Sequence, residues 1–150
     1  MRCRIRLAAT AILLPLAVAL PQVARAADAG TATCSAATLD GTYLFAFSGI
    51  NVSAGGSRPF AVAGYEVYDG AGGMRSVTTT NADGKLERNV RQPGTYTVAA
   101  DCTGTVTYAD GTIYDLFVAP DGATFVFVET NPERVAAGFE PRATAQRVAE

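Results

Sequence analysis

The chain has 150 residues with 12 basic and 14 acidic side chains, a formal net charge of −2, and it contains neither histidine nor tryptophan. The lack of histidine excludes the serine–histidine and cysteine–histidine pairs that activate most protein nucleophiles. The acidic balance argues against nucleic acid or an anionic membrane as partner, because both are bound through an excess of basic side chains.

Residues 1–26 have the three parts of a secretory signal peptide. A positive start, MRCRIR, is followed by the 14-residue apolar run LAATAILLPLAVAL and by small residues before the expected cleavage after Ala26. The run is shorter than the roughly 20 residues of a spanning helix, and no cysteine follows it directly to carry a lipid. We expect a secreted or periplasmic mature chain without a membrane anchor, with 8 basic and 14 acidic residues and a net charge of −6.

Two cysteines remain after removal of the signal. Cys34 lies in the segment 27–40, which has few large side chains and suggests a loop with a helical turn, and Cys102 lies 68 residues further on. Two cysteines in an exported chain predict one disulfide. A metal site or a cysteine nucleophile would need further cysteine or histidine partners, so we expect neither a metal nor a cofactor.

From Gly41 onward, short apolar and aromatic runs alternate with turn residues. The dipeptide Asp-Gly, which favours tight hairpin turns, occurs five times. The predicted strands are 42–49, 58–69, 74–81, 85–91, 94–101, 103–110, 112–119, 123–130 and 134–145. Eight or nine strands with short connections predict an all-β fold over 41–145, an antiparallel up-and-down β-barrel of about eight strands, with a β-sandwich as the alternative and 146–150 as a tail.

Alternation along the strands assigns side chains to faces. Tyr43, Phe45 and Phe47 share one face of the first strand. Residues 123–130 are apolar on both faces, which suits a strand covered on both sides or a barrel wall with an oligomer contact outside. The sequence does not define the oligomeric state.

Two carboxylates lie inside apolar strands. Glu66 shares a face with Tyr68, and Asp115 shares a face with Phe117. If either face lines the barrel interior, the carboxylate is partly desolvated and can act as an acid, a base or a polar anchor. Alternatively, both carboxylates point to solvent or pair with arginines.

The mature chain is rich in aromatic residues, which either line a pocket for an apolar ligand or fill a narrow barrel. The candidate ligand-binding residues are Glu66, Asp115, Tyr43, Phe45, Tyr68 and Phe117. The residues themselves assign no catalytic group.

The segments LDGTYLFAFSG, AGYEVYDGAGG, GTYTVAADCTGTV and TFVFVET together resemble a group of small exported bacterial β-barrel proteins related to the calycins and the allene oxide cyclase-like barrels. The resemblance implies about eight strands around an interior cavity. Related barrels include ligand carriers as well as cyclases, so the fold alone does not fix the function. Three functions remain open: an exported barrel that binds a small apolar ligand, a barrel isomerase or cyclase, and a structural or interaction module.

Overall fold

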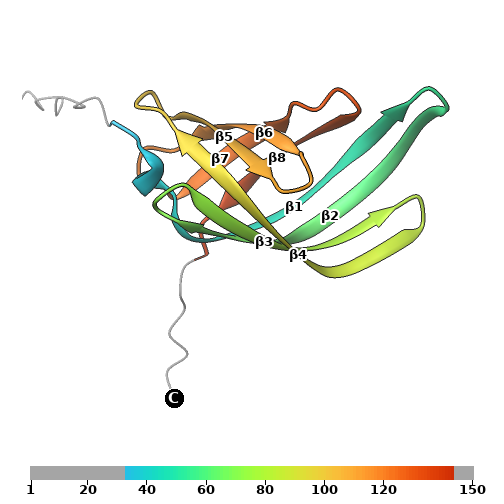
Figure 1. The fold of residues 1–150 in the computed structure, drawn as a ribbon, viewed down its shortest axis with the longest axis horizontal. Coiled ribbons are helices and arrows are strands. Elements are labelled where there is room, and N and C mark those ends of the chain that lie inside the picture. The colour runs from blue at the N-terminus through green and yellow to red at the C-terminus, as the bar shows by residue number, and fades with distance from the viewer. Residues whose placement is uncertain (1–32, 144–150) are drawn as a thin grey trace, which may run out of the picture. The chain divides into compact units, whose positions relative to one another are not determined.

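A computed structural model describes residues 33–143, which form a closed antiparallel β-barrel (Figure 1). The elements are η1 Ala36–Thr38, β1 Asp40–Ser53, β2 Gly56–Asp69, β3 Gly73–Ala82, β4 Lys85–Val98, β5 Thr103–Tyr108, β6 Ile113–Val118, β7 Thr124–Glu129 and β8 Arg134–Pro141. Each strand pairs with the next, and β8 returns to pair with β1. The predicted eight-stranded up-and-down barrel is confirmed, and the sandwich alternative is wrong. The predicted signal peptide and the tail 146–150 lie outside the described residues.

One pair of predicted strands is a single strand in the structure. Residues 85–91 and 94–101 were expected to be separate, but β4 runs without interruption through Pro93, which lies opposite Arg75 of β3. The chain accommodates this long strand with a β-bulge at Asn89, whose φ of 54° shifts the β3–β4 register.

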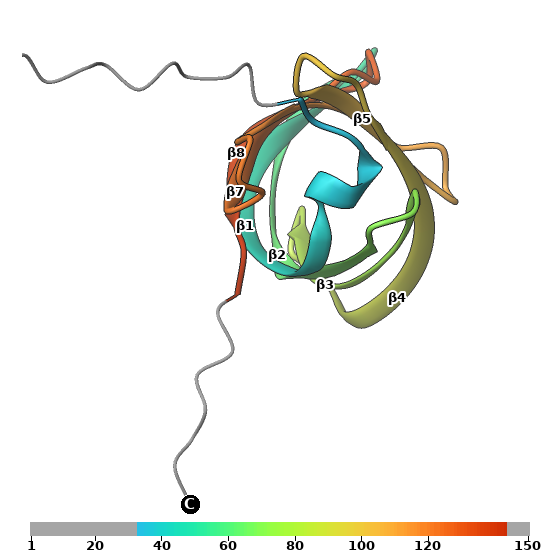
Figure 2. The ribbon, with the colours of Figure 1, turned by 90° about the vertical axis from the view of Figure 1, so that its left-hand side faces the viewer.

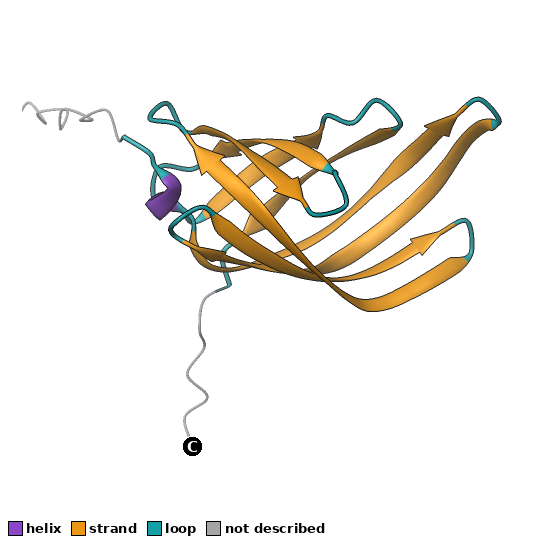
Figure 3. Cartoon of the chain, viewed as in Figure 1, coloured by secondary structure: helices purple, strands orange, loops and turns teal. Residues whose placement is uncertain are grey.

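The strands differ in length, and this makes the two ends of the barrel different. β1, β2 and β4 have 14 residues each, whereas β5, β6 and β7 have six. The β1–β2 and β3–β4 hairpins therefore extend past the short strands at one end (Figures 1 and 3). We call this the open end, and the opposite end, where η1 lies, the closed end.

The N-terminal segment covers the closed end, as Figure 2 shows. Leu39 is fully buried there, and the Tyr96 hydroxyl lies 2.9 Å from the carbonyl oxygen of Ala36 and 2.8 Å from that of Leu39. A disulfide joins Cys34, just before η1, to Cys102 between β4 and β5. The predicted disulfide and the predicted helical turn, η1, are thus both present. The disulfide and the hydrogen bonds of Tyr96 attach η1 to the barrel wall.

The turn at Asp121-Gly122 packs against η1 and requires glycine. Gly122 has a φ of 66°, and a Cβ at this position would lie 2.1 Å from the carbonyl oxygen of Thr38. The carbonyl oxygen of Gly122 accepts a buried hydrogen bond of 2.6 Å from the Tyr43 hydroxyl. The turn between β6 and β7 is therefore joined to β1 and packs against η1 at the closed end.

Aromatic side chains fill the half of the barrel next to the closed end. The Tyr43 and Tyr68 rings meet edge to face at 5.3 Å, and Tyr68 meets Tyr96 at 4.9 Å. A smaller apolar cluster, formed by Phe45, Phe60, Val62 and Ala136, lies toward the open end. Phe47 packs against both clusters. The closed half is a packed core, and open space is found further along the barrel.

Candidate functional site

The structure separates the six candidate ligand-binding residues into two groups. Tyr43, Phe45, Glu66 and Tyr68 lie inside the barrel and are buried. Asp115 and Phe117 lie on the outer face of β6, because the alternating residues Tyr114 and Leu116 occupy the interior. Of the two alternatives left open by the sequence, the solvent-facing one therefore holds for Asp115, whereas Glu66 lies in the interior.

A pocket of about 110 Å³ lies at the open end. Its apolar wall comes from β1 and β2 and consists of Phe45, Phe47 and Val62. The remaining lining is mostly polar and comprises Thr78, Thr80, Gln92, Tyr108, Asp110, Thr112, Tyr114 and Arg134. This open-end pocket therefore presents hydrogen-bonding groups opposite a hydrophobic surface.

Arg134 is the first residue of β8, and two contacts hold its side chain in place at this pocket. Its Nε lies 3.3 Å from Oε1 of Glu129, whose side chain is fully buried, and its guanidinium carbon lies 4.4 Å from the centre of the Phe60 ring. Burial raises the pKa of Glu129, and the charge of Arg134 opposes that rise. The positive charge is thus already matched by a carboxylate of the protein.

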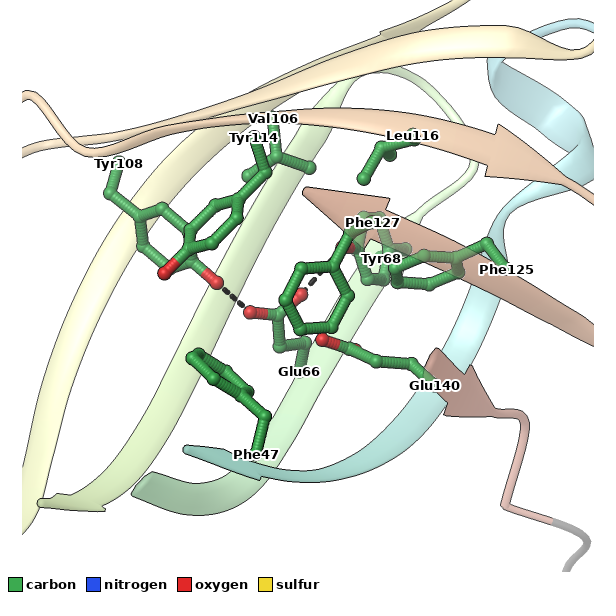
Figure 4. Close-up of a pocket in the computed structure, with 10 residues that line it drawn as sticks. All are labelled: Phe47, Glu66, Tyr68, Val106, Tyr108, Tyr114, Leu116, Phe125, Phe127 and Glu140. Carbon is green, nitrogen blue, oxygen red and sulfur yellow. Dashed lines mark hydrogen bonds between the residues drawn. The ribbon is translucent and has the colours of Figure 1, made fainter. Parts of the chain in front are cut away.

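A second, inner pocket lies deeper in the barrel and has a volume of about 10 Å³, which is room for about one water molecule. Glu66 of β2 lines it and is 1% exposed. The Tyr68 hydroxyl donates a 2.5 Å hydrogen bond to Oε2 of Glu66, and the Tyr108 hydroxyl of β5 donates to Oε1 (Figure 4). These two phenols hold the carboxyl group of Glu66 in a single orientation.

Glu140 of β8 is the second carboxyl group of the inner pocket, and it is 4% exposed. Within residues 33–143, no hydrogen-bond partner meets its buried Oε2. Burial, reinforced by the charge of Glu66, raises the pKa of Glu140 to about 10, and burial raises the pKa of Glu66 to about 7. At neutral pH Glu140 is therefore protonated, while Glu66 is divided between its two forms.

Sequence reasoning identified Glu66 but missed Glu129, Arg134 and Glu140. Alternation provided a signal for Glu129, which shares a face with Phe125 and Phe127. Glu140 shares a face with Ala136, but the strand around it is rich in small residues and carries little apolar pattern.

The described barrel interior contains more carboxyl groups than cations. Three buried carboxyl groups, Glu66, Glu129 and Glu140, face one partly buried cation, Arg134. Residues 33–143 contain no cluster of three acidic, cysteine or histidine side chains suited to a metal ion, and no helix long and apolar enough to cross a membrane. The polar groups of the inner pocket are carboxyl groups and phenol hydroxyls, and they lie beside aromatic rings.

The chain matches no protein-family model, and no curated protein or solved structure is significantly similar to it.

Proposed function

We propose that the mature chain is an exported barrel that binds a small molecule in its open-end pocket. The observation that carries this proposal is the pocket itself, with an apolar wall facing a polar wall at the end that η1 leaves uncovered. The signal-peptide pattern and the disulfide support export. The resemblance to calycin-type barrels, which include ligand carriers, agrees with the proposal.

The lining of the pocket indicates the class of ligand. Phe45, Phe47 and Val62 suit an apolar body, and Gln92 and Thr112 suit a neutral polar group. Asp110 lines the pocket and the charge of Arg134 is already paired, so a neutral or cationic ligand is favoured over an anion. The volume lies well below the roughly 300 Å³ of common ligand pockets, so the ligand is small or inserts only one end.

Filling the pocket tests the proposal. We expect Val62→Phe to weaken ligand binding at least about 10-fold, because a methylene in a hydrophobic pocket already changes affinity by that order. The control is Thr95→Phe, which adds the same ring at an exposed outward position of β4, away from the pocket. Neutral alcohols and ketones, primary amines and carboxylates of four to eight carbons would be screened by ligand-observed NMR. Equal binding by both variants, or no binding to the wild type, would contradict the proposal.

A second function, proton transfer in an isomerase, is favoured by the position of Tyr108. Its side chain lines both pockets, and its hydroxyl is hydrogen-bonded to Glu66. In this mechanism a C–H proton of the bound molecule passes to Tyr108 as Tyr108 gives its own proton to ionised Glu66. The reverse transfer returns a proton to another carbon, so the double bond moves and no co-reactant is consumed.

Glu66→Gln separates this function from simple binding. We expect it to slow C–H/D exchange of a bound ketone in D₂O by about 100-fold or more, with the affinity changed by less than about threefold. The control is Glu133→Gln, which alters an exposed carboxylate. Exchange that is absent in the wild type, or unchanged in Glu66→Gln, would leave binding as the function.

A further inference from the structure

The outer face of four adjacent strands carries no charge over most of its length, and Asp40 of β1 and Asp69 of β2 lie at its limit near the closed end. On β7 and β8 the outward positions are Thr124, Val126, Val128, Val135, Ala137, Phe139 and Pro141. On β1 and β2 the outward positions from Thr42 to Val52 and from Pro59 to Val67 are Thr42, Leu44, Ala46, Ser48, Ile50, Val52, Pro59, Ala61, Ala63, Tyr65 and Val67. We call this surface the uncharged face.

Large apolar side chains on this face are open to solvent. Phe139 is 64% exposed and Val126 is 49% exposed. They are register partners, and Val126 is also the partner of Phe117 on β6, which is 55% exposed. The three side chains form a continuous row across β6, β7 and β8. Further exposed apolar residues of the face are Leu44, Ile50, Val52, Tyr65, Val128 and Val135.

The apolar area of the uncharged face is similar to the area that one partner buries in a standard protein–protein interface. A half-exposed large apolar side chain presents on the order of 60–100 Å². The nine exposed residues, Phe117 included, therefore present roughly 500–900 Å² of apolar surface. Monomeric proteins rarely expose more than a few hundred Å² in one patch, whereas each partner in a standard interface buries about 800 Å².

The opposite wall of the barrel is different. Its outward positions include Arg91 and Thr95 on β4, both of them exposed. Among the described residues, most exposed large apolar side chains therefore lie on the uncharged face and on Phe117 beside it, and Leu86 and Val90 of β4 are the exceptions. The strands of the uncharged face are paired with their neighbours in the closed barrel, so a partner of this surface packs against its side chains rather than adding a strand.

We propose that the uncharged face packs against the same face of a second copy of this chain, in a two-fold symmetric homodimer. The face offers no charge with which to bind a charged partner, and its apolar side chains are complementary to the same apolar face of another copy. Within the uncharged face no like charges of two acidic chains meet, and Asp115 of β6, the register partner of Val128, lies at its border. The area available on each copy is close to that required of one partner in a two-fold interface.

The test introduces a charge at the centre of the face. The mature, oxidised protein would be studied by sedimentation equilibrium from about 1 to 100 µM, and we expect the mass of two chains. Phe139→Glu and, independently, Val126→Glu are expected to raise the dimer dissociation constant by about 100-fold or more. Thr95→Glu, which adds the same charge to the opposite wall, is expected to remain dimeric. Circular dichroism confirms that each variant is folded.

Sedimentation equilibrium also distinguishes the other possible partners of the uncharged face. A folded wild type that is monomeric at 100 µM would overturn the proposal. So would a monomer that dimerises only after deletion of 144–150, because the chain's own tail would then be the occupant. A trimer or larger assembly would overturn the two-fold arrangement. A folded Phe139→Glu variant as dimeric as Thr95→Glu would exclude this face as the interface.

Discussion

Replacing Cys34 and Cys102 together with serine is expected to lower the free energy of unfolding of the mature protein by about 4 kcal/mol. A crosslink that closes a loop of 68 residues restricts the unfolded chain by roughly that amount. For a domain of this size the loss corresponds to a fall of about 15 °C in Tm. Thermal and urea unfolding followed by circular dichroism would measure both quantities.

The loss should be centred on the closed end, because Cys34 attaches η1 to the barrel. Amide hydrogen exchange of Leu39 and Tyr96 should accelerate more than that of the open-end strands. Ser35→Ala, which keeps the disulfide, serves as the control. A change of less than about 1 kcal/mol in the double variant would show that η1 is held by packing alone.

The free energy of unfolding is expected to fall as the pH rises from about 4.5. An unfolded glutamate has a pKa of 4.5, whereas folding raises the pKa of Glu66 to about 7 and that of Glu140 to about 10. Between pH 4.5 and the raised pKa of each glutamate, the folded protein holds more protons than the unfolded chain. Raising the pH in this range therefore favours unfolding. For Glu66 alone, the loss between pH 4.5 and 7 is on the order of 3 kcal/mol.

Carboxylates whose pKa is lowered by folding limit the stability of the protein in acid. Asp69 accepts hydrogen bonds from the backbone amides of Ala71 and Gly73, and these bonds lower its pKa. Its contribution is present above the ordinary pKa of an aspartate and is lost as the pH falls below it. Stability should therefore be greatest between about pH 4 and 4.5.

Glu140→Gln isolates the pH effect, because glutamine has the shape of the protonated acid. We expect this variant to be more stable than the wild type at pH 8 and to show a weaker decline between pH 5 and 9. Glu133→Gln, at an exposed position of the preceding turn, should follow the wild-type curve. Urea unfolding at several pH values would decide the matter. An unchanged decline in Glu140→Gln would mean that Glu140 is already ionised in the folded protein.

Much of the fold could be predicted because local signals agree with it. The Asp-Gly turns and the alternating strands specify hairpins between neighbours, and such hairpins form a barrel. The union of 85–91 and 94–101 in one strand could not be predicted, because the bulge at Asn89 depends on pairing with β3. That pairing is a property of the closed sheet.

The site was only partly predictable, for a physical reason. Alternation shows which residues share a face, but not which face points inward. Glu66 and Asp115 have similar apolar neighbours, yet only Glu66 lies inside. β6 and β7 are ambiguous because their outer sides carry Phe117 and Val126, which extend the apolar row of the uncharged face. The same residues that obscure the site therefore indicate the interface.

The most direct test of the account is an amide chemical-shift map of the ¹⁵N-labelled mature protein, titrated with the best neutral ligand from the NMR screen. We expect shifts at Val62, Thr80, Gln92 and Thr112, around the open-end pocket, and none at Leu39 or Cys102 at the closed end. Shifts confined to the outer face of β7 and β8, or spread evenly over the barrel, would contradict the claim that the open end is the binding site.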